Sequence, residues 1–234
     1  MKLTRRIRRL WRYWFPYGGL RSLRELESLG FRGNLFLAFE AERVSGRIEF
    51  VQPGNNTVEI GAGSDFSGVI LVRGSGNIVR IGPGCTIRGR ITVKGMNQRV
   101  IIGENTTFAG VSILAQENCD VIIGSHCMFS RDIEIRTSDS HSVIAKSDLR
   151  RLNKPASVKI GNHVWLGLRC IVNKGAKIPD DSVVGAAAFV NKAFDETGII
   201  LAGSPAKIVK RGVTWQRERK NSFKSEQLGD WGSR

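Results

Sequence analysis

The sequence predicts an all-β fold in which short parallel strands stack as the coils of a single β-helix. The first observation is a repeat, because four Ile-Gly pairs recur every 21 residues; they begin at Ile60, Ile81, Ile102 and Ile123. The second is a six-residue recurrence of aliphatic or aromatic residues, which continues beyond residue 160 without the longer period. The third is composition, because 27 glycines beside only 6 prolines favour many tight turns without a proline-rich linker.

Strand geometry explains the six-residue unit. A strand of four or five residues alternates its side chains between two faces, and a corner then follows, so each unit forms one flat side. Three sides close a triangular coil, and stacked coils share one hydrophobic core. Each 21-residue period holds three extra residues, which we place beside turn-forming asparagines: Asn56, Asn77, Asn97 and Asn118.

The position four residues after each aliphatic start should point inward, where only a modest volume fits. Small residues occupy it along the whole repeat: Ser64, Cys85, Thr106, Cys127, Val164, Cys170, Ala176, Ser182 and Ala188. Three of the four cysteines are therefore predicted to pack in the core, and the cysteine spacing matches neither a zinc site nor a redox pair. Cys119 lies in an insert and receives no role.

The formal charge of +15 is large and calls for a partner of opposite charge or another reason. Nucleic acid, an anionic membrane surface, an acidic glycan and a phosphate-rich cofactor are the candidates. The sequence carries no motif typical of nucleic-acid binding, which argues against that partner. No apolar run approaches the roughly 20 residues that cross a bilayer, and no secretory apolar segment follows the N-terminal arginines. We expect a cytoplasmic protein, soluble or peripheral at the inner membrane surface.

We predict three parts of the chain. Residues 1–44 form a basic amphipathic segment, residues 45–203 form the β-helix domain, and residues 204–234 form a tail. Apolar and arginine side chains occupy opposite arcs of a helix that Pro16 ends, and a second short helix reaches Gly30. Two interpretations stay open and are compatible. Residues 1–16 can lie on an anionic membrane, or the segment can cap the open end of the β-helix.

The recurrence stops between residues 136 and 157, where the polar stretch RTSDSHSVIAKSDLRRLNKPAS intervenes. A loop this long inside a regular solenoid is either functional or disordered. His141 lies at its base, and an imidazole can take up a proton from a hydroxyl near neutral pH, so we predict a general base. A solvated loop histidine is the alternative. Asp139 can fix the imidazole tautomer, contact the acceptor, or serve as a plain turn residue.

From residue 157 onward, SVKIGNHVWLGLRCIVNKGAKIPDDSVVGAAAFVNK followed by ILAGSPAKIVKR resembles the closing coils of hexapeptide-repeat acyltransferases. Sugar and capsule polysaccharide O-acetyltransferases are the most similar branch, and the resemblance covers roughly residues 45–212. It implies a left-handed β-helix, a homotrimer with active sites between subunits, and acetyl-CoA as acyl donor. It also implies His141 as the catalytic base. Trp165, 24 residues later, would line the active site, with packing at the trimer interface as the alternative.

The resemblance further implies a cofactor-binding edge on the last coils. Small residues would admit the pantetheine arm, and cations would meet the phosphates; the candidates are Gly167, Gly185, Ala186, Lys192, Lys207 and Arg211. Two departures leave the individual contacts open. Residues 185–188 read Gly-Ala-Ala-Ala where the family has Gly-Ala-Gly-Ser, and Asn191 replaces a common threonine. A purely structural role for glycine at corners is the alternative.

His126 and His163 each follow an aliphatic start by three residues and should face outward on one column. A zinc site would need three suitably placed imidazoles, and the spacing of these two from His141 does not resemble such a site. We therefore expect no metal and two histidines at the surface or at a subunit interface.

These observations together predict an enzyme that transfers an acetyl group from acetyl-CoA to a sugar hydroxyl of a surface or capsular polysaccharide, and an acidic polymer is among the candidate acceptors. Acetylation of an amino sugar or nucleotide-sugar nitrogen would need the same base and stays open. A non-catalytic β-helix scaffold is the alternative from another class. The loop histidine and the SPAK edge, which is the stretch at residues 204–207, argue against it.

Overall fold

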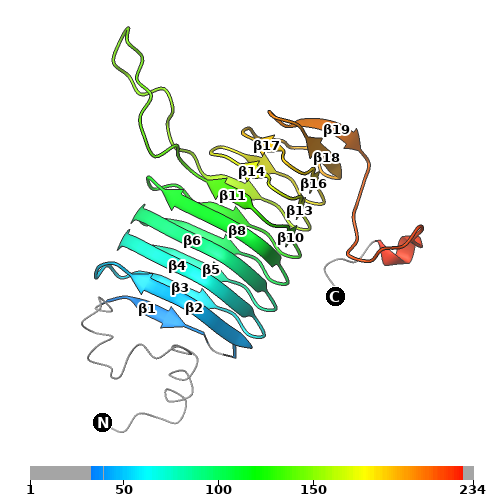
Figure 1. The fold of residues 1–234 in the computed structure, drawn as a ribbon, viewed down its shortest axis with the longest axis horizontal. Helices are drawn as coiled ribbons and strands as arrows, with labels where there is room; N and C mark the ends of the chain where they lie inside the picture. Colours follow the sequence, from blue (N-terminus) through cyan, green and yellow to red (C-terminus); the bar gives the residue numbers. More distant parts are fainter. Residues whose placement is uncertain (1–32, 39, 229–234) are drawn as a thin grey trace.

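The computed structural model describes residues 33–38 and 40–228 and forms a left-handed parallel β-helix whose coils stack along one axis (Figure 1). This confirms the predicted fold class. The helices that we predict within residues 1–30, and the membrane contact through residues 1–16, lie outside the described residues. In the part of the chain that is described, none of the helices has the length and apolar character needed to cross a membrane.

One side of the triangular coil, called side 1 here, is a seven-stranded parallel sheet. Its strands in spatial order are β1 (Leu35–Leu37), β3 (Thr57–Ile60), β5 (Ile78–Ile81), β7 (Arg99–Ile102), β9 (Val121–Ile123), β12 (Val158–Ile160) and β15 (Lys177–Ile178). Ile60, Ile81, Ile102 and Ile123 are register partners on successive coils. One coil is therefore 21 residues long there, as the repeat predicts.

The other two sides belong to a twelve-stranded sheet. In the first coils it consists of long strands: β2 (Arg43–Phe50), β4 (Asp65–Ser75), β6 (Thr86–Met96) and β8 (Thr107–Gln116). In later coils these split into two short strands. Side 2 carries β10 (Met128–Phe129), β13 (Trp165–Leu166) and β16 (Val183–Val184), and side 3 carries β11 (Ile133–Arg136), β14 (Ile171–Val172) and β17 (Phe189–Val190).

The three edges of the prism are named by the sides they join. The 1–2 edge follows each strand of side 1, the 2–3 edge follows each strand of side 2, and the 3–1 edge follows each strand of side 3. β18 (Ile199–Ala202) continues side 2 and turns back into the antiparallel strand β19 (Lys207–Arg211). A short 3-10 helix, Ser225–Gln227, follows in the C-terminal tail.

The long early strands differ from the separate six-residue sides that we expected. They pass the 2–3 edge without a break, because a glycine stands where each strand bends. Gly68 and Gly89 have φ of +157° and +142°, and they are register partners. A Cβ on Gly68 would lie 1.9 Å from the carbonyl oxygen of Gly89. The bend therefore depends on backbone that only glycine supplies at both positions.

The core runs the length of the coils, and its small inward positions are filled as predicted. Every residue that we assigned to that position is buried: Ser64, Cys85, Thr106, Cys127, Val164, Cys170, Ala176, Ser182 and Ala188. Phe108 and Phe129 stack on successive coils with ring centroids 4.7 Å apart. The three core cysteines are free thiols, which agrees with a packing role.

The extra residues of the long coils carry two different kinds of side chain. Asn34, Asn56 and Asn77 are buried and form a ladder. The Nδ2 of Asn56 donates to Asn34 Oδ1 at 2.8 Å, and the Nδ2 of Asn77 donates to Asn56 Oδ1 at 2.9 Å. The next member of this ladder is Gln98, whose backbone N–H donates to Asn77 Oδ1 at 3.0 Å. Asn97 belongs instead to an exposed turn with φ of +55°. The turn that we predicted is confirmed at Asn97, whereas Asn56 and Asn77 are ladder residues whose counterpart on the next coil is Gln98.

The two sheets extend beyond the boundaries at 45 and 203 that we drew from the sequence. β1 pairs with β3, and β2 begins at Arg43, so the first coil starts upstream of residue 45. At the other end β19 pairs with β18 and carries the sheet to Arg211.

Candidate active site

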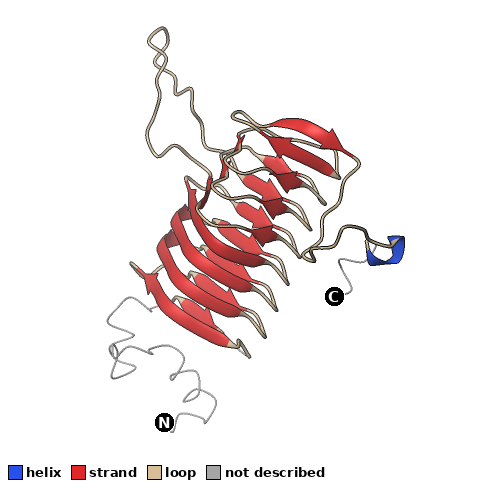
Figure 2. Cartoon of the chain, turned by 45° about the vertical axis from the view of Figure 1, so that its right-hand side comes forward, coloured by secondary structure: helices blue, strands red, loops and turns tan. Residues whose placement is uncertain are grey.

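The stretch from residue 137 to 157 leaves the 3–1 edge between β11 and β12 and projects far from the coils (Figure 2). An antiparallel bridge between Ile144 and Arg151 brings its two arms together. The coil register continues across the interruption, because Ile123 pairs directly with Ile160. The loop is thus an excursion from an otherwise regular coil, as the break in the repeat predicts.

Asn153 ties the two arms of the loop together at its base. Its Nδ2 donates to Asp139 Oδ2 and to the carbonyl oxygen of His141, both at 2.8 Å. Its Oδ1 accepts a hydrogen bond from the Val143 N–H at 2.7 Å. One side chain therefore joins the Asp139 carboxylate to the backbone of His141 and Val143.

Two ion pairs fasten this loop base to the coils. Lys174, from the next coil, pairs with the Asp139 carboxylate, and Arg151 donates to Glu117 at 2.5 and 3.1 Å. The hydrogen bonds from Lys174, and then from Asn153, lower the pKa of Asp139. Hydrogen bonds from Arg151, and then from Ser138, lower the pKa of Glu117 to about 2. Both carboxylates stay ionised at neutral pH and hold the loop base in place.

His141 is exposed at the base of the loop, where we placed it. The Asp139 carboxylate, which we considered as a partner for its imidazole, is engaged by Lys174 and Asn153. Asp139 and the His141 carbonyl are therefore linked through the side chain of Asn153.

Trp165 lies on β13, on side 2, and its side chain faces outward with 38% of the residue exposed. His141 belongs to the 3–1 edge, so one chain presents the two residues on different parts of the prism. The ring of Trp215, from the C-terminal tail, lies beside Trp165 with centroids 6.0 Å apart. Trp215 received no role in the sequence analysis, because it follows the repeat and no periodicity connects it to a coil.

His163 differs from the surface histidine that we predicted, since it is only 4% exposed. Its side chain does point away from the core, but the ring of Trp215 stacks on it at 4.3 Å. Its Nδ1 lies 2.8 Å from Asp181 Oδ1. Burial lowers the pKa of His163, and Asp181 opposes that effect. His126, on the preceding coil, is partly exposed. Among residues 33–38 and 40–228, no group of three or more potential ligands could hold a metal ion.

The candidate cofactor residues divide between the edges. Gly167 and Gly185 are stacked on the 2–3 edge, where each backbone N–H donates to the next coil at 2.8 Å, and Ala186 follows there, exposed. Lys207 joins this group through its pairing with Ala202. A Cβ on Gly185 would meet the Ala202 Cβ at 3.4 Å, an ordinary contact, so packing within the chain does not require glycine there. Gly167 does have a structural reason, because a Cβ there would lie 2.8 Å from the Ala186 nitrogen.

The other two candidates lie elsewhere. Lys192 is on the 3–1 edge, with its Nζ 5.2 Å from the ring centroid of Phe194. Arg211, at the far end of β19, pairs with Glu196 at 3.0 Å. A single chain therefore gathers four of the six predicted cofactor residues on one edge.

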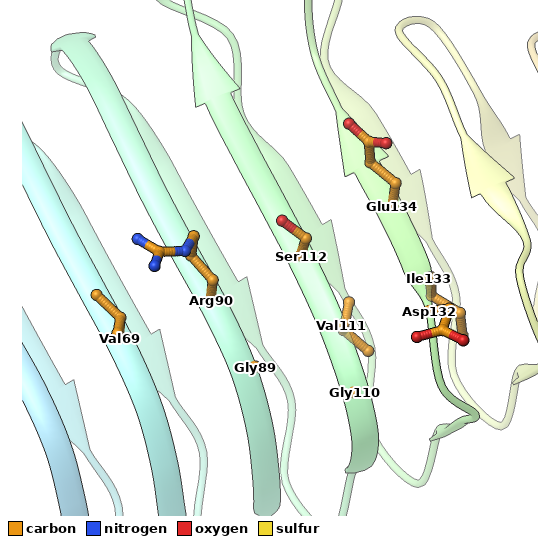
Figure 3. Close-up of a pocket in the computed structure, with 9 residues that line it drawn as sticks. All are labelled: Val69, Gly89, Arg90, Gly110, Val111, Ser112, Asp132, Ile133 and Glu134. Atoms are coloured by element: carbon orange, nitrogen blue, oxygen red, sulfur yellow. The ribbon is translucent and has the colours of Figure 1, made fainter.

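A shallow groove of about 550 Å³ crosses β4, β6, β8 and β11 on the earlier coils (Figure 3). Arg90, Ser112 and Glu134 point outward along it from register-matched positions, and Asp132 lies at its end. The groove holds charges of both signs and none of the residues that the sequence singles out.

The fold and the site together define a class: a left-handed β-helix of hexapeptide repeats, with a histidine-bearing loop leaving one coil and a SPAK edge closing the stack. No family model matches the chain. The polysialic acid O-acetyltransferase OatWY superposes with a TM-score of 0.75 at 30% identity, over 83% of this chain and 93% of that one. The polySia-specific acetyltransferase NeuO gives 0.73 at 31% identity, over 82% and 88%.

The curated relatives with similar sequences include the same type of enzyme. Polysialic acid O-acetyltransferases from Escherichia coli O1:K1 / APEC and from Neisseria meningitidis are each 34% identical, over 43% and 41% of this chain. The matches span 32% and 45% of those two proteins, less than half of their length. The chain belongs to the hexapeptide-repeat acyltransferase family, alongside the polysialic acid O-acetyltransferases.

Proposed function

We propose that this protein transfers an acetyl group from acetyl-CoA to a hydroxyl of an acidic surface or capsular polysaccharide, with His141 as general base. The observation that carries this is the position of His141 at the base of the loop that interrupts the coils. It occurs in a chain that matches a polysialic acid O-acetyltransferase over 93% of that protein's chain. The charge of +15 supports an anionic acceptor, because complementary charge speeds encounter.

The proposed reaction is one displacement at the thioester carbonyl. The acceptor hydroxyl gives its proton to an imidazole nitrogen of His141 while its oxygen attacks the carbonyl carbon. The carbon–sulfur bond then breaks, and the sulfur leaves as a thiolate that takes the proton back from the imidazolium. The products are an acetyl ester and CoA with a free thiol. The hydrogen bonds of Asn153 would hold His141 in position for the first of these proton transfers.

We place the donor on the 2–3 edge. The small residues Gly167, Gly185 and Ala186 leave a shelf on which an extended pantetheine arm can lie against the backbone. Lys207, exposed at the end of this shelf, can donate to a phosphate.

We further propose a homotrimer with composite sites. His141 and Lys192 belong to the 3–1 edge, whereas Trp165 and the donor shelf belong to side 2 and the 2–3 edge. Two neighbouring subunits would therefore contribute one group each, with Trp165 offering an indole face to the acceptor. A monomer with full activity would contradict this arrangement.

The decisive experiment compares His141→Ala with the unaltered enzyme, using labelled acetyl-CoA with polysialic acid and with a neutral polysaccharide. Loss of a positioned general base should lower turnover on the acidic polymer by about 10² to 10⁴. Binding of acetyl-CoA and the melting temperature should change little, because His141 is exposed and is not among the proposed pantetheine or phosphate contacts.

His126→Ala is the matched control and should keep its turnover. His163→Ala is unsuitable as a control, because that imidazole is buried under Trp215. Near-normal turnover of His141→Ala on an acceptor that the unaltered enzyme acetylates would remove His141 as the base.

A further inference from the structure

We propose that Trp215 is a positioning residue. The C-terminal strap places it beside Trp165, where it keeps the Trp165 ring in the orientation that contacts the acceptor. The C-terminal strap is the segment 212–217, directly after β19. This inference rests on the proposed function, which gives Trp165 its contact with the acceptor.

The strap runs back along the solenoid instead of leaving it. From β19 the chain returns beside the side that carries β16, β13 and β10 (Figure 1). The Val213 N–H donates to the Gly198 carbonyl at 3.0 Å, which starts this return. Trp215 is only 5% exposed, although it stands in a tail rich in charged residues.

Trp215 is held by several groups at once. Its Nε1 donates to the carbonyl oxygen of His163 at 2.8 Å, and its ring stacks on the His163 imidazole at an interplanar angle of 9°. Asp181 Oδ1 lies 2.8 Å from the imidazole Nδ1 and accepts the Thr214 hydroxyl at 2.7 Å. The indole therefore has a defined orientation, because both its polar atom and its face are engaged.

Arg217 secures the far end of the strap. Its guanidinium lies 5.9 Å from the Trp215 ring centroid, and it donates to Thr107 Oγ1 at 2.9 Å and to the Cys127 carbonyl at 3.1 Å. Thr107, Met128 and Trp165 are register partners on three successive coils. The strap thus borders the column of outward side chains to which Trp165 belongs.

Trp165 needs such a neighbour. Its column partners Met128 and Val183 lie on the coils before and after it, and its outward ring is otherwise open to solvent. Trp215 lies beside it, with the rings tilted by 48° and centroids 6.0 Å apart, a distance at which aromatic rings attract each other. Removing Trp215 would free the Trp165 side chain to leave the orientation that meets the acceptor.

A double-mutant cycle in the full-length enzyme tests this. Trp215→Leu, Trp165→Ala and the double variant are compared for acceptor KM, acetyl-CoA KM, kcat and melting temperature. An aromatic pair contributes about 0.5–1.5 kcal/mol, so Trp215→Leu should raise the acceptor KM about two- to tenfold. The acetyl-CoA KM should stay within twofold, and the double variant should resemble Trp165→Ala alone.

Trp215→Phe keeps a ring against His163 and Trp165 and should restore most of the acceptor KM. A lower melting temperature with unchanged acceptor KM, or effects that add in the double variant, would overturn the positioning role and leave a structural one. If Trp215→Leu does not fold, Arg217→Ala enters the same cycle, since it loosens the strap, and an additive result overturns the inference equally. An unchanged acceptor KM in Trp165→Ala would instead refute the proposed role of Trp165, and the inference with it.

Discussion

The buried asparagine ladder gives a stability prediction whose size follows from its hydrogen bonds. Asn77→Leu keeps the branched four-atom skeleton of the side chain but removes three of them. Asn77 Nδ2 donates to Asn56 Oδ1 at 2.9 Å and to the Gly95 carbonyl at 3.0 Å, and its Oδ1 accepts the Gln98 N–H at 3.0 Å. The last loss leaves a buried backbone donor without this partner. Each bond contributes about 1 kcal/mol, and an unsatisfied buried group costs more, so the free energy of unfolding should fall by about 3–5 kcal/mol.

Denaturant unfolding, followed by circular dichroism, measures this difference. Asn97→Ala is the matched control, because Asn97 lies on the same coil but in an exposed turn. Its φ of +55° makes alanine less favourable by about 1–2 kcal/mol, so it should cost clearly less than Asn77→Leu. Equal losses for the two variants, or a leucine variant as stable as the original, would refute the reasoning that the ladder holds the long coils together.

The remaining predictions concern the core and the loop base. Cys127→Phe should destabilise the protein by about 1–3 kcal/mol, because the inward position has no room for a ring. Burial raises the pKa of the Cys127 thiol to about 12, so a bulky thiol reagent should modify it only after unfolding, which mass spectrometry can follow. The pKa of Glu117 lies near 2, below its ordinary 4.5. Its stabilising effect on the loop base is complete above pH 4.5 and is lost as the pH falls toward 2, so acid protease should cleave residues 142–152 faster over that range; a cleavage rate independent of pH would contradict it.

Much of the fold could be predicted from the sequence, because a solenoid repeats one local pattern. The Ile-Gly period and the small inward position are properties of single coils. The register partners Ile60 and Ile81 confirm the period, and the burial of Cys85 and Cys127 confirms the inward position. The departures arise where one coil acts on the next. In the sequence Gly68 looks like an ordinary strand glycine, and only the close approach of Gly89 on the next coil shows why glycine is needed. Gln98 takes the ladder position because it pairs with Asn77 on the adjacent coil.

The candidate site could be predicted only in part for the same reason. His141 and Trp165 stand at distinctive places in the repeat, at a break and beside a corner. Asn153 and Trp215 carry no such mark, because their contacts reach across the loop arms and back along the coils. The exposure expected for His163 was wrong since its cover comes from the tail, 52 residues later in the chain.

The direct pairing of Ile123 with Ile160 has a consequence for how such proteins can diversify. The coil closes as if the intervening loop were absent, so the loop can change in length or composition without altering the pitch of the stack. Changes to the acceptor contacts would then be uncoupled from changes to the scaffold. Under the proposed function, grafting the corresponding loop of a relative between β11 and β12 should alter polymer preference on an unchanged solenoid.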